Sequence, residues 1–182
     1  MRGLCPNNLN LPRKAMSKNN FVLIRGGGDL ATGVALRLHR AGIKVVISEL
    51  AQPLAVRPTV SFSEAVYEGH HTVEGVTARL IEAQQFPACA KRDADEIPIL
   101  VDPNADILLS HPFSVVVDAR LIKQPPAPLP VDVPLHIGLG PGFNAGSDCH
   151  AVIETRRSHT PSAAARGYDG FCRRRPLRRR SD

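Results

Sequence analysis

Phe21-Val-Leu-Ile-Arg-Gly-Gly-Gly-Asp-Leu-Ala-Thr-Gly33 is the stretch that decides the fold of this 182-residue chain. An apolar run ends in a glycine turn, and a helical pattern begins directly behind it. Gly26, Gly28 and Ala31 match G-x-G-x-x-[G/A], in which glycines let the backbone approach a pyrophosphate at a helix N-terminus. The stretch therefore predicts a strand, turn and helix that bind a nucleotide.

A second apolar run, Ile43 to Ser48, ends at the acidic residue Glu49 and predicts a strand at 44–48. Glu49 follows Gly28 by 21 residues, which is the spacing of the carboxylate that holds the ribose in such units. With a strand at 20–25 and a helix at 30–41, this run predicts a compact βαβ unit with a parallel strand pair and a right-handed crossover.

The turn itself supplies the candidate phosphate-binding residues Gly26, Gly27 and Gly28. Asp29 follows them, and two interpretations of it stay open. It is either the N-cap of the helix or an anion that opposes a phosphate. A glycine-rich turn without any ligand is the alternative to a nucleotide site.

Beyond this unit the chain alternates short apolar runs with proline-rich or glycine-rich breaks. Further strands are predicted at 97–101, 114–117, 135–139 and 151–154, with 118–123 continuing the second of them. A short helix is predicted at 61–67, with Ser61 as its cap and Glu64 as its capping-box partner, and 73–84 mixes strand-like and helix-like halves. The pattern indicates an α/β fold, Rossmann-like, with a mainly parallel sheet.

A second glycine-rich turn spans Gly138 to Gly146, and we expect Gly140 and Gly142 to complete the nucleotide pocket. The turn either holds an anion on its backbone N–H groups or serves a loop that needs positive φ angles. Three polar residues follow this turn: Asp148, His150 and Glu154. They either belong to a solvated loop or supply acid–base groups or metal ligands. Since neither a metal nor a catalytic residue is singled out, no metal site is predicted.

Other polar residues lie at the ends of predicted strands. Asp102, Asp118 and Arg120 either line a cleft or form salt bridges. Ser110 and His111 lie between two predicted strands, where active-site loops occur, but no G-x-S-x-G elbow supports a hydrolase.

The net charge of +6 is concentrated at one end of the chain. From Thr160 onward, seven arginines and two aspartates carry +5 of it, so the rest is close to neutral and nucleic acid is not an expected partner. Hydrophobic residues make up 43% and Trp is absent, which predicts a core of Val, Ile, Leu and Ala.

Four scattered cysteines, with no C-x-x-C pair, indicate reduced thiols and a cytoplasmic protein. No apolar run approaches the ~18 residues of a membrane span, so no membrane partner is expected. We expect three parts: a disordered extension at 1–19, a Rossmann-like domain at 20–159 with a proline-rich connector at 123–134, and a disordered arginine-rich tail at 160–182.

Seven blocks in the predicted domain carry a family resemblance: Arg25-Gly-Gly-Gly-Asp-Leu-Ala-Thr-Gly33, Phe62-Ser-Glu-Ala-Val-Tyr67, Val73-Glu-Gly-Val76, Val101-Asp-Pro103, Val117-Asp-Ala-Arg120, Gly138-Leu-Gly-Pro-Gly-Phe143 and Ile153-Glu-Thr155. In this order, over about Phe21 to His159, they resemble the bacterial selenium-dependent molybdenum hydroxylase system proteins, also labelled molybdenum hydroxylase. The resemblance implies a Rossmann-like domain and a cytoplasmic accessory protein that helps to mature or insert the molybdenum cofactor. It supplies no established catalytic residues.

The resemblance ends near Arg157-Ser-His159, where Ser158 stands in place of the family's usual glycine. We interpret the arginine-rich ending as the product of a frameshift or a truncated gene. The predicted function is a maturation factor for a molybdenum hydroxylase apoenzyme, binding a nucleotide, a dinucleotide or a molybdopterin nucleotide. An NAD-dependent oxidoreductase that uses the same turn and a non-catalytic protein-interaction module are the alternatives.

Overall fold

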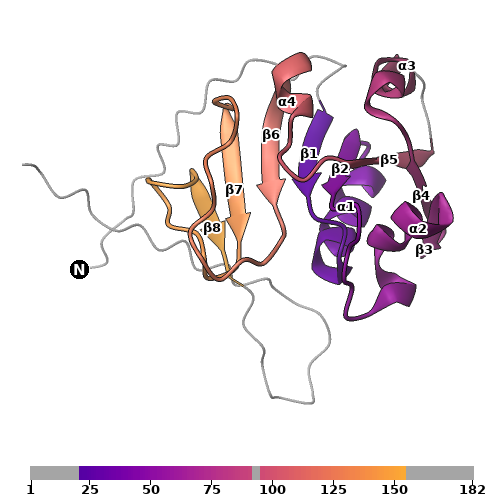
Figure 1. Ribbon diagram of the computed structural model, residues 1–182, viewed down its shortest axis with the longest axis horizontal. Coiled ribbons are helices and arrows are strands. Elements are labelled where there is room, and N and C mark those ends of the chain that lie inside the picture. Colours follow the sequence, from indigo (N-terminus) through magenta and orange to yellow (C-terminus); the bar gives the residue numbers. More distant parts are fainter. Residues whose placement is uncertain (1–20, 92–94, 155–182) are drawn as a thin grey trace, which may run out of the picture.

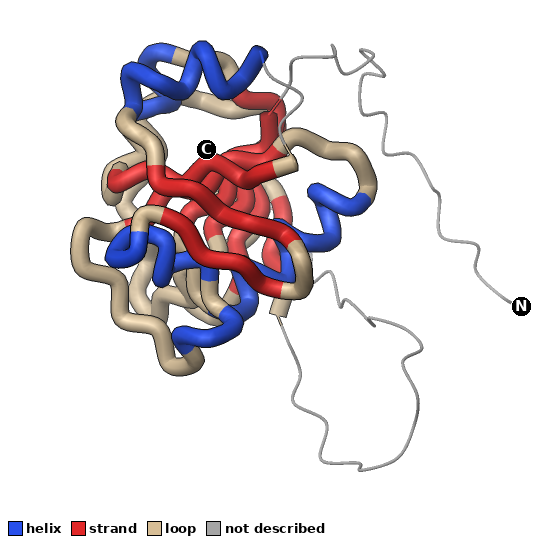
Figure 2. Tube along the Cα trace, turned by 90° about the vertical axis from the view of Figure 1, so that its right-hand side faces the viewer, coloured by secondary structure: helices blue, strands red, loops and turns tan. Residues whose placement is uncertain are grey.

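A mainly parallel sheet with helices on both sides forms the body of the protein (Figures 1 and 2). The structure is a computed structural model, which describes residues 21–91 and 95–154. Within these residues the sheet has eight strands in the order β3-β4-β5-β2-β1-β6-β7-β8. The predicted α/β class is confirmed. The predicted extension at 1–19 and the predicted tail at 160–182 lie outside the described residues.

The strands are short and mostly apolar. Their bounds are β1 (Phe21–Arg25), β2 (Val45–Glu49), β3 (His70–Val73), β4 (Val76–Leu80), β5 (Glu96–Val101), β6 (Phe113–Asp118), β7 (Leu135–Leu139) and β8 (Ala151–Ile153). The helical segments are α1 (Asp29–Arg40), η1 (Pro58–Val60), η2 (Phe62–Glu64), α2 (Ala65–Glu68), η3 (Ala83–Gln85), α3 (Phe86–Lys91) and α4 (Ile107–Ser110).

The strand order reverses at the centre of the sheet. β1 pairs in parallel with β2 on one side and with β6 on the other, and β6 and β7 continue in the same direction (Figure 1). The chain thus leaves β1 toward one half of the sheet and later returns to build the other half. In α/β sheets ligands bind in the crevice at the carboxyl ends of the strands at such a switch point.

Burial of β1 on both faces explains its uninterrupted apolar run. Val22 and Ile24 pack toward α1 and α2, whereas Phe21 and Leu23 pack toward α3 and α4. The helix α1 lies close to the sheet because Ala31, its residue in the glycine motif, is buried and small.

Two local predictions are wrong: the continuation of β6 and the capping role of Ser61. β6 ends at Asp118, and the chain does not continue as a strand through 118–123; Leu121 has a positive φ of 55°, which is incompatible with an extended backbone at that position. The helix predicted at 61–67 is present, as the two consecutive helical segments η2 and α2. The Ser61 hydroxyl donates to the Arg57 carbonyl and makes no cap bond.

The hairpin β3–β4 was not predicted as such. Its turn residues Glu74 and Gly75 both have positive φ angles, 48° and 79°, which is the geometry of a type I′ turn. β3 is half exposed and begins with two histidines, so it lacks the apolar alternation of a typical strand.

Glycines permit close backbone contacts around the end of β7. A Cβ atom on Gly142 would lie 2.4 Å from the Ile122 carbonyl oxygen, and one on Gly138 would lie 2.3 Å from the Phe143 ring. The segment after β6 therefore crosses directly against the second glycine turn.

We expect Gly142→Ala to lower the free energy of unfolding by about 1–3 kcal/mol, because backbone atoms must move to admit the methyl group. Gly33→Ala in α1 is the matched control: its Cβ meets nothing within 4 Å, so the change stabilises by up to about 1 kcal/mol. Chemical denaturation measures both. Equal stability of the two variants would contradict the close crossing.

Candidate functional site

The glycine turn lies at the carboxyl end of β1, at the switch point. Gly26 has a φ of 96°, and its N–H donates to the Ser48 carbonyl at 2.8 Å. A Cβ on Gly26 would lie 3.3 Å from Cγ of Arg120, which follows β6. The turn therefore joins the ends of β1, β2 and β6.

Gly27 is enclosed by the chain itself. Its N–H donates to Oε2 of Glu49 at 2.5 Å, and its carbonyl accepts from the Ser63 N–H at 2.8 Å and from the Thr32 hydroxyl. A Cβ here would lie 3.0 Å from the Ser63 nitrogen. Close packing against Ser63 explains the need for glycine at this position.

Gly28 is open. A Cβ on Gly28 would meet nothing within 4 Å, and its φ of −65° suits any residue. Among the described residues, no hydrogen bond uses the N–H of Gly28 or of Asp29. These two groups are free donors at a helix N-terminus, where the helix dipole favours an anion.

Asp29 is the first residue of α1 and not its N-cap, which is Gly28. The N-cap interpretation is wrong because the helix begins one residue earlier than predicted. Oδ1 of Asp29 accepts from the Leu30 N–H at 2.9 Å, and Oδ2 forms an ion pair with Arg57 at 2.7 Å. The Arg57 guanidinium thus offsets the negative charge that Asp29 brings to the turn.

Glu49 lies beside the turn, as its spacing requires. Oε1 accepts from the Leu50 N–H at 2.7 Å while Oε2 accepts from Gly27. Its binding of a ribose stays a prediction.

Gly140 and Gly142 follow the carboxyl end of β7, on the same side of the sheet as the first turn, which follows the carboxyl end of β1. The Gly140 N–H donates to the Ile153 carbonyl and the Gly142 N–H donates to the Ile122 carbonyl, both at 3.0 Å. Those two N–H groups are thus engaged within the chain. The predicted contribution of these glycines to a nucleotide pocket stays a prediction.

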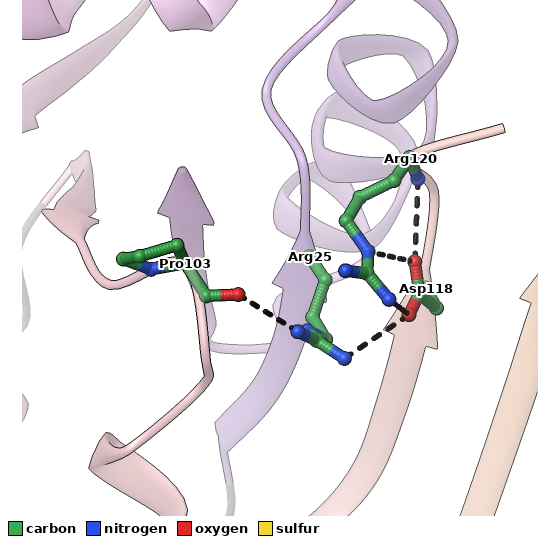
Figure 3. Close-up of polar contacts among 4 residues, drawn as sticks. All are labelled: Arg25, Pro103, Asp118 and Arg120. Atoms are coloured by element: carbon green, nitrogen blue, oxygen red, sulfur yellow. Dashed lines mark hydrogen bonds and ion pairs between the residues drawn. The ribbon is translucent and has the colours of Figure 1, made fainter. Parts of the chain in front are cut away.

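Charged side chains meet at the carboxyl ends of β1 and β6 (Figure 3). Arg120 donates to Asp118 from Nε at 2.8 Å and from Nη2 at 2.6 Å, and Arg25 donates to the same carboxylate from Nη1 at 3.3 Å. Arg25 also donates from Nη2 to the Pro103 carbonyl at 2.9 Å. Of the two open interpretations, salt bridging therefore describes Asp118 and Arg120.

Burial lowers the pKa of Arg25, since removing the guanidinium from water disfavours its charged form. The Asp118 carboxylate opposes this effect and the Arg120 charge adds to it. The role of Arg25 was missed by sequence reasoning. Its signal is a charged residue that ends an otherwise apolar strand within the glycine motif.

Asp102 does not join the cluster of Arg25, Asp118 and Arg120. Its two oxygens accept from the N–H groups of Asp106 and Ile107, at 2.8 and 3.0 Å, and so bind the start of α4. Ser110 is the last residue of α4, and its hydroxyl lies 2.9 Å from Nδ1 of His111 and donates to the Ile107 carbonyl at 3.2 Å. Within the described residues, no hydrogen bond joins His111 to an acidic side chain.

The residues after the second glycine turn divide by role. Asp148 accepts from the Asn144 main chain at 2.8 Å and from the Ser147 hydroxyl, which fixes the loop. Nδ1 of His150 accepts from the His136 main-chain N–H at 3.0 Å. Glu154 follows β8 and takes no part in these hydrogen bonds.

His136 was also missed, because a single histidine in an apolar strand carries little signal. It is buried on β7, and its Nε2 has no hydrogen-bond partner among the described residues. Burial lowers the pKa of His136, because the charged imidazolium is disfavoured away from water.

Two cavities lie away from the first glycine turn. One, of about 310 Å³, is lined by residues at the amino ends of β1, β2 and β5, including Phe21 and Glu96, and by Arg79 and Ile81 near the end of β4. The other, of about 780 Å³, lies between the connector and the loop that holds Asp148 and His150. Neither of these two cavities is lined by Gly28.

Within 21–91 and 95–154, no three histidine, cysteine or acidic side chains come together as a metal site. Over the same residues, no helix has the length and apolarity needed to cross a membrane.

We expect stability to fall as the pH drops below about 6.5, the ordinary histidine value. In that range the unfolded chain binds a proton that the buried His136 resists, so protonation favours unfolding. His136→Gln should flatten the dependence of melting temperature on pH between about 7.5 and about 5, whereas His70→Gln, at an exposed site, should not. Identical slopes in all three proteins would contradict this role of His136.

Comparison with known proteins gives one relative of note. The chain is 46% identical over 154 residues to the uncharacterized protein YqeB of Escherichia coli (strain K12). The match covers 85% of this chain and 28% of YqeB, so the chain spans less than a third of the length of that relative. No protein-family model and no solved structure matches the chain.

Proposed function

We propose that this protein is a cytoplasmic accessory factor that binds a nucleotide and assists the maturation of a selenium-dependent molybdenum hydroxylase. The nucleotide is either free or the nucleotide-bearing form of the molybdenum cofactor. The binding part of the proposal and the partner part have separate support.

The free N–H groups of Gly28 and Asp29 carry the binding part. They lie at the N-terminus of α1 and at the point where the strand order reverses, which is where α/β sheets bind nucleotides. Phosphate oxygens are suitable acceptors for two such donors. Glu49 lies on the adjacent strand end, from which its carboxylate would accept from ribose hydroxyls.

Glu49 also limits how the phosphate binds. Its carboxylate already accepts the Gly27 N–H, and a phosphate at the same donor would meet a like charge. In the proposed complex the phosphate therefore bonds to Gly28 and Asp29, while Glu49 keeps Gly27.

The partner part rests on the seven sequence blocks, which resemble the selenium-dependent molybdenum hydroxylase system proteins from Phe21 to His159. The printed name of YqeB assigns no activity, so the similarity to YqeB neither supports nor weakens the proposed partner.

For the nucleotide, we expect calorimetry to detect binding of one or more of NAD, FAD, ATP, CTP and molybdopterin nucleotides. Gly28→Val should weaken that binding at least about tenfold, because the side chain fills the open space and blocks charge-assisted hydrogen bonds. Gly33→Ala, with equal freedom from clashes, should bind like the parent chain.

The alternatives predict different results. Reduction of NAD with an added substrate would favour the oxidoreductase. No binding of any nucleotide would contradict the proposal and favour an interaction module, as would equal binding by Gly28→Val.

For the partner, we expect the chain to form a complex with a purified molybdenum hydroxylase apoenzyme and to raise its activity when molybdenum cofactor is added. Size-exclusion chromatography and hydroxylase assays measure the two effects. The Gly28→Val variant should keep the complex and lose the activation, and an apoenzyme that activates equally without the chain would contradict the accessory role.

A further inference from the structure

The nucleotide contacts proposed above involve the glycine turn and Glu49 and leave out a charged cluster that also lies at the switch point. We propose that Arg25 and Arg120, bridged by Asp118, form an oxyanion site that binds a phosphate group beside the glycine turn. Where that phosphate belongs to a nucleotide, the inference rests on the function proposed above. Where it is inorganic, the site stands independently.

The first argument is the count of donors. Asp118 is fully buried, and its two oxygens accept from both guanidinium groups and from the Arg120 main chain. Among the described residues, Nη1 of Arg120 and Nε of Arg25 then have no hydrogen-bond partner. A tetrahedral oxyanion presents several acceptors and matches such forked donors.

The second argument is charge. Both guanidinium groups contact the same oxygen, Oδ2 of Asp118, so two positive charges share one negative charge. Asp102 is near enough to act on Arg25 electrostatically, but its carboxylate is engaged at the start of α4. An incoming oxyanion relieves the repulsion between the two arginines.

The third argument is position. The aliphatic part of Arg120 packs on Gly26, where a Cβ would lie 3.3 Å from its Cγ, and the guanidinium extends from there to Asp118 and lies beside Arg25, the residue that precedes the turn (Figure 3). The Arg120 side chain is 30% exposed, whereas Arg25 is nearly enclosed. A ligand therefore reaches Arg120 directly, and Arg25 acts from beneath it.

The test is calorimetric titration of the full chain with inorganic pyrophosphate, a nucleoside diphosphate and the matching nucleoside. Arg120→Gln should weaken pyrophosphate binding at least about tenfold, since it removes a charged donor to the anion. Arg79→Gln is the matched control. It removes an equally forked pair, with Glu96 at 2.6 and 2.7 Å, on β4 and β5.

A second variant separates binding from a structural role. Asp118→Asn leaves both guanidinium groups without their carboxylate. We expect pyrophosphate to raise the melting temperature of this variant more than that of the parent chain, whereas a purely structural salt bridge predicts no such gain. If Asp118→Asn does not fold, Arg120→Gln decides the matter.

The outcomes distinguish the two proposals. If Arg120→Gln leaves the binding of both pyrophosphate and the nucleotide unchanged, the oxyanion site is overturned and the proposed function is kept. Pyrophosphate binding that depends on Arg120, without nucleotide binding, supports the site and overturns the nucleotide function. Absence of pyrophosphate binding in the parent chain overturns the site.

Discussion

β1 is buried on both faces and hydrogen-bonded on both edges, and the other elements are arranged around it. β2 supplies one edge and β6 the other, and helices cover both faces. Because the partners of β1 come from different halves of the chain, its carboxyl end is the place where those halves meet. The glycine turn and the Arg25–Asp118 pair both lie at that end.

The sequence predicts those elements whose apolar residues recur with a clear period and whose ends are marked by glycine or another terminating residue. Residues 20–49 have both, so the βαβ unit is placed to within a residue or so at each end. β3, α3 and α4 are short and have no such signal. The predicted extension of β6 is not formed, and Leu121, which has a φ of 55° that leucine rarely adopts, lies against Gly140.

Site prediction divides along the same line. Motif and spacing place the three turn glycines and Glu49 together, because those features depend on the local βαβ geometry. They do not reveal that the Gly27 N–H is already bonded to Glu49 and the Gly27 carbonyl to the Ser63 N–H, because these contacts depend on the packing of the folded chain. Arg25 and His136 are not predicted as site residues because their importance comes from burial. A single polar residue in an apolar strand gives no sign in the sequence that it is buried.

The segment after β6 touches both glycine turns: Arg120 packs on Gly26, and the backbone at 121–124 packs on Gly140 and Gly142. In evolutionary terms, an insertion or deletion here would have to be matched at two distant loops at once. In the connector that follows, the partly buried side chains Leu129, Val131 and Val133 pack against the core. Related chains should therefore keep a constant length between β6 and residue 124 and vary in length further along the connector.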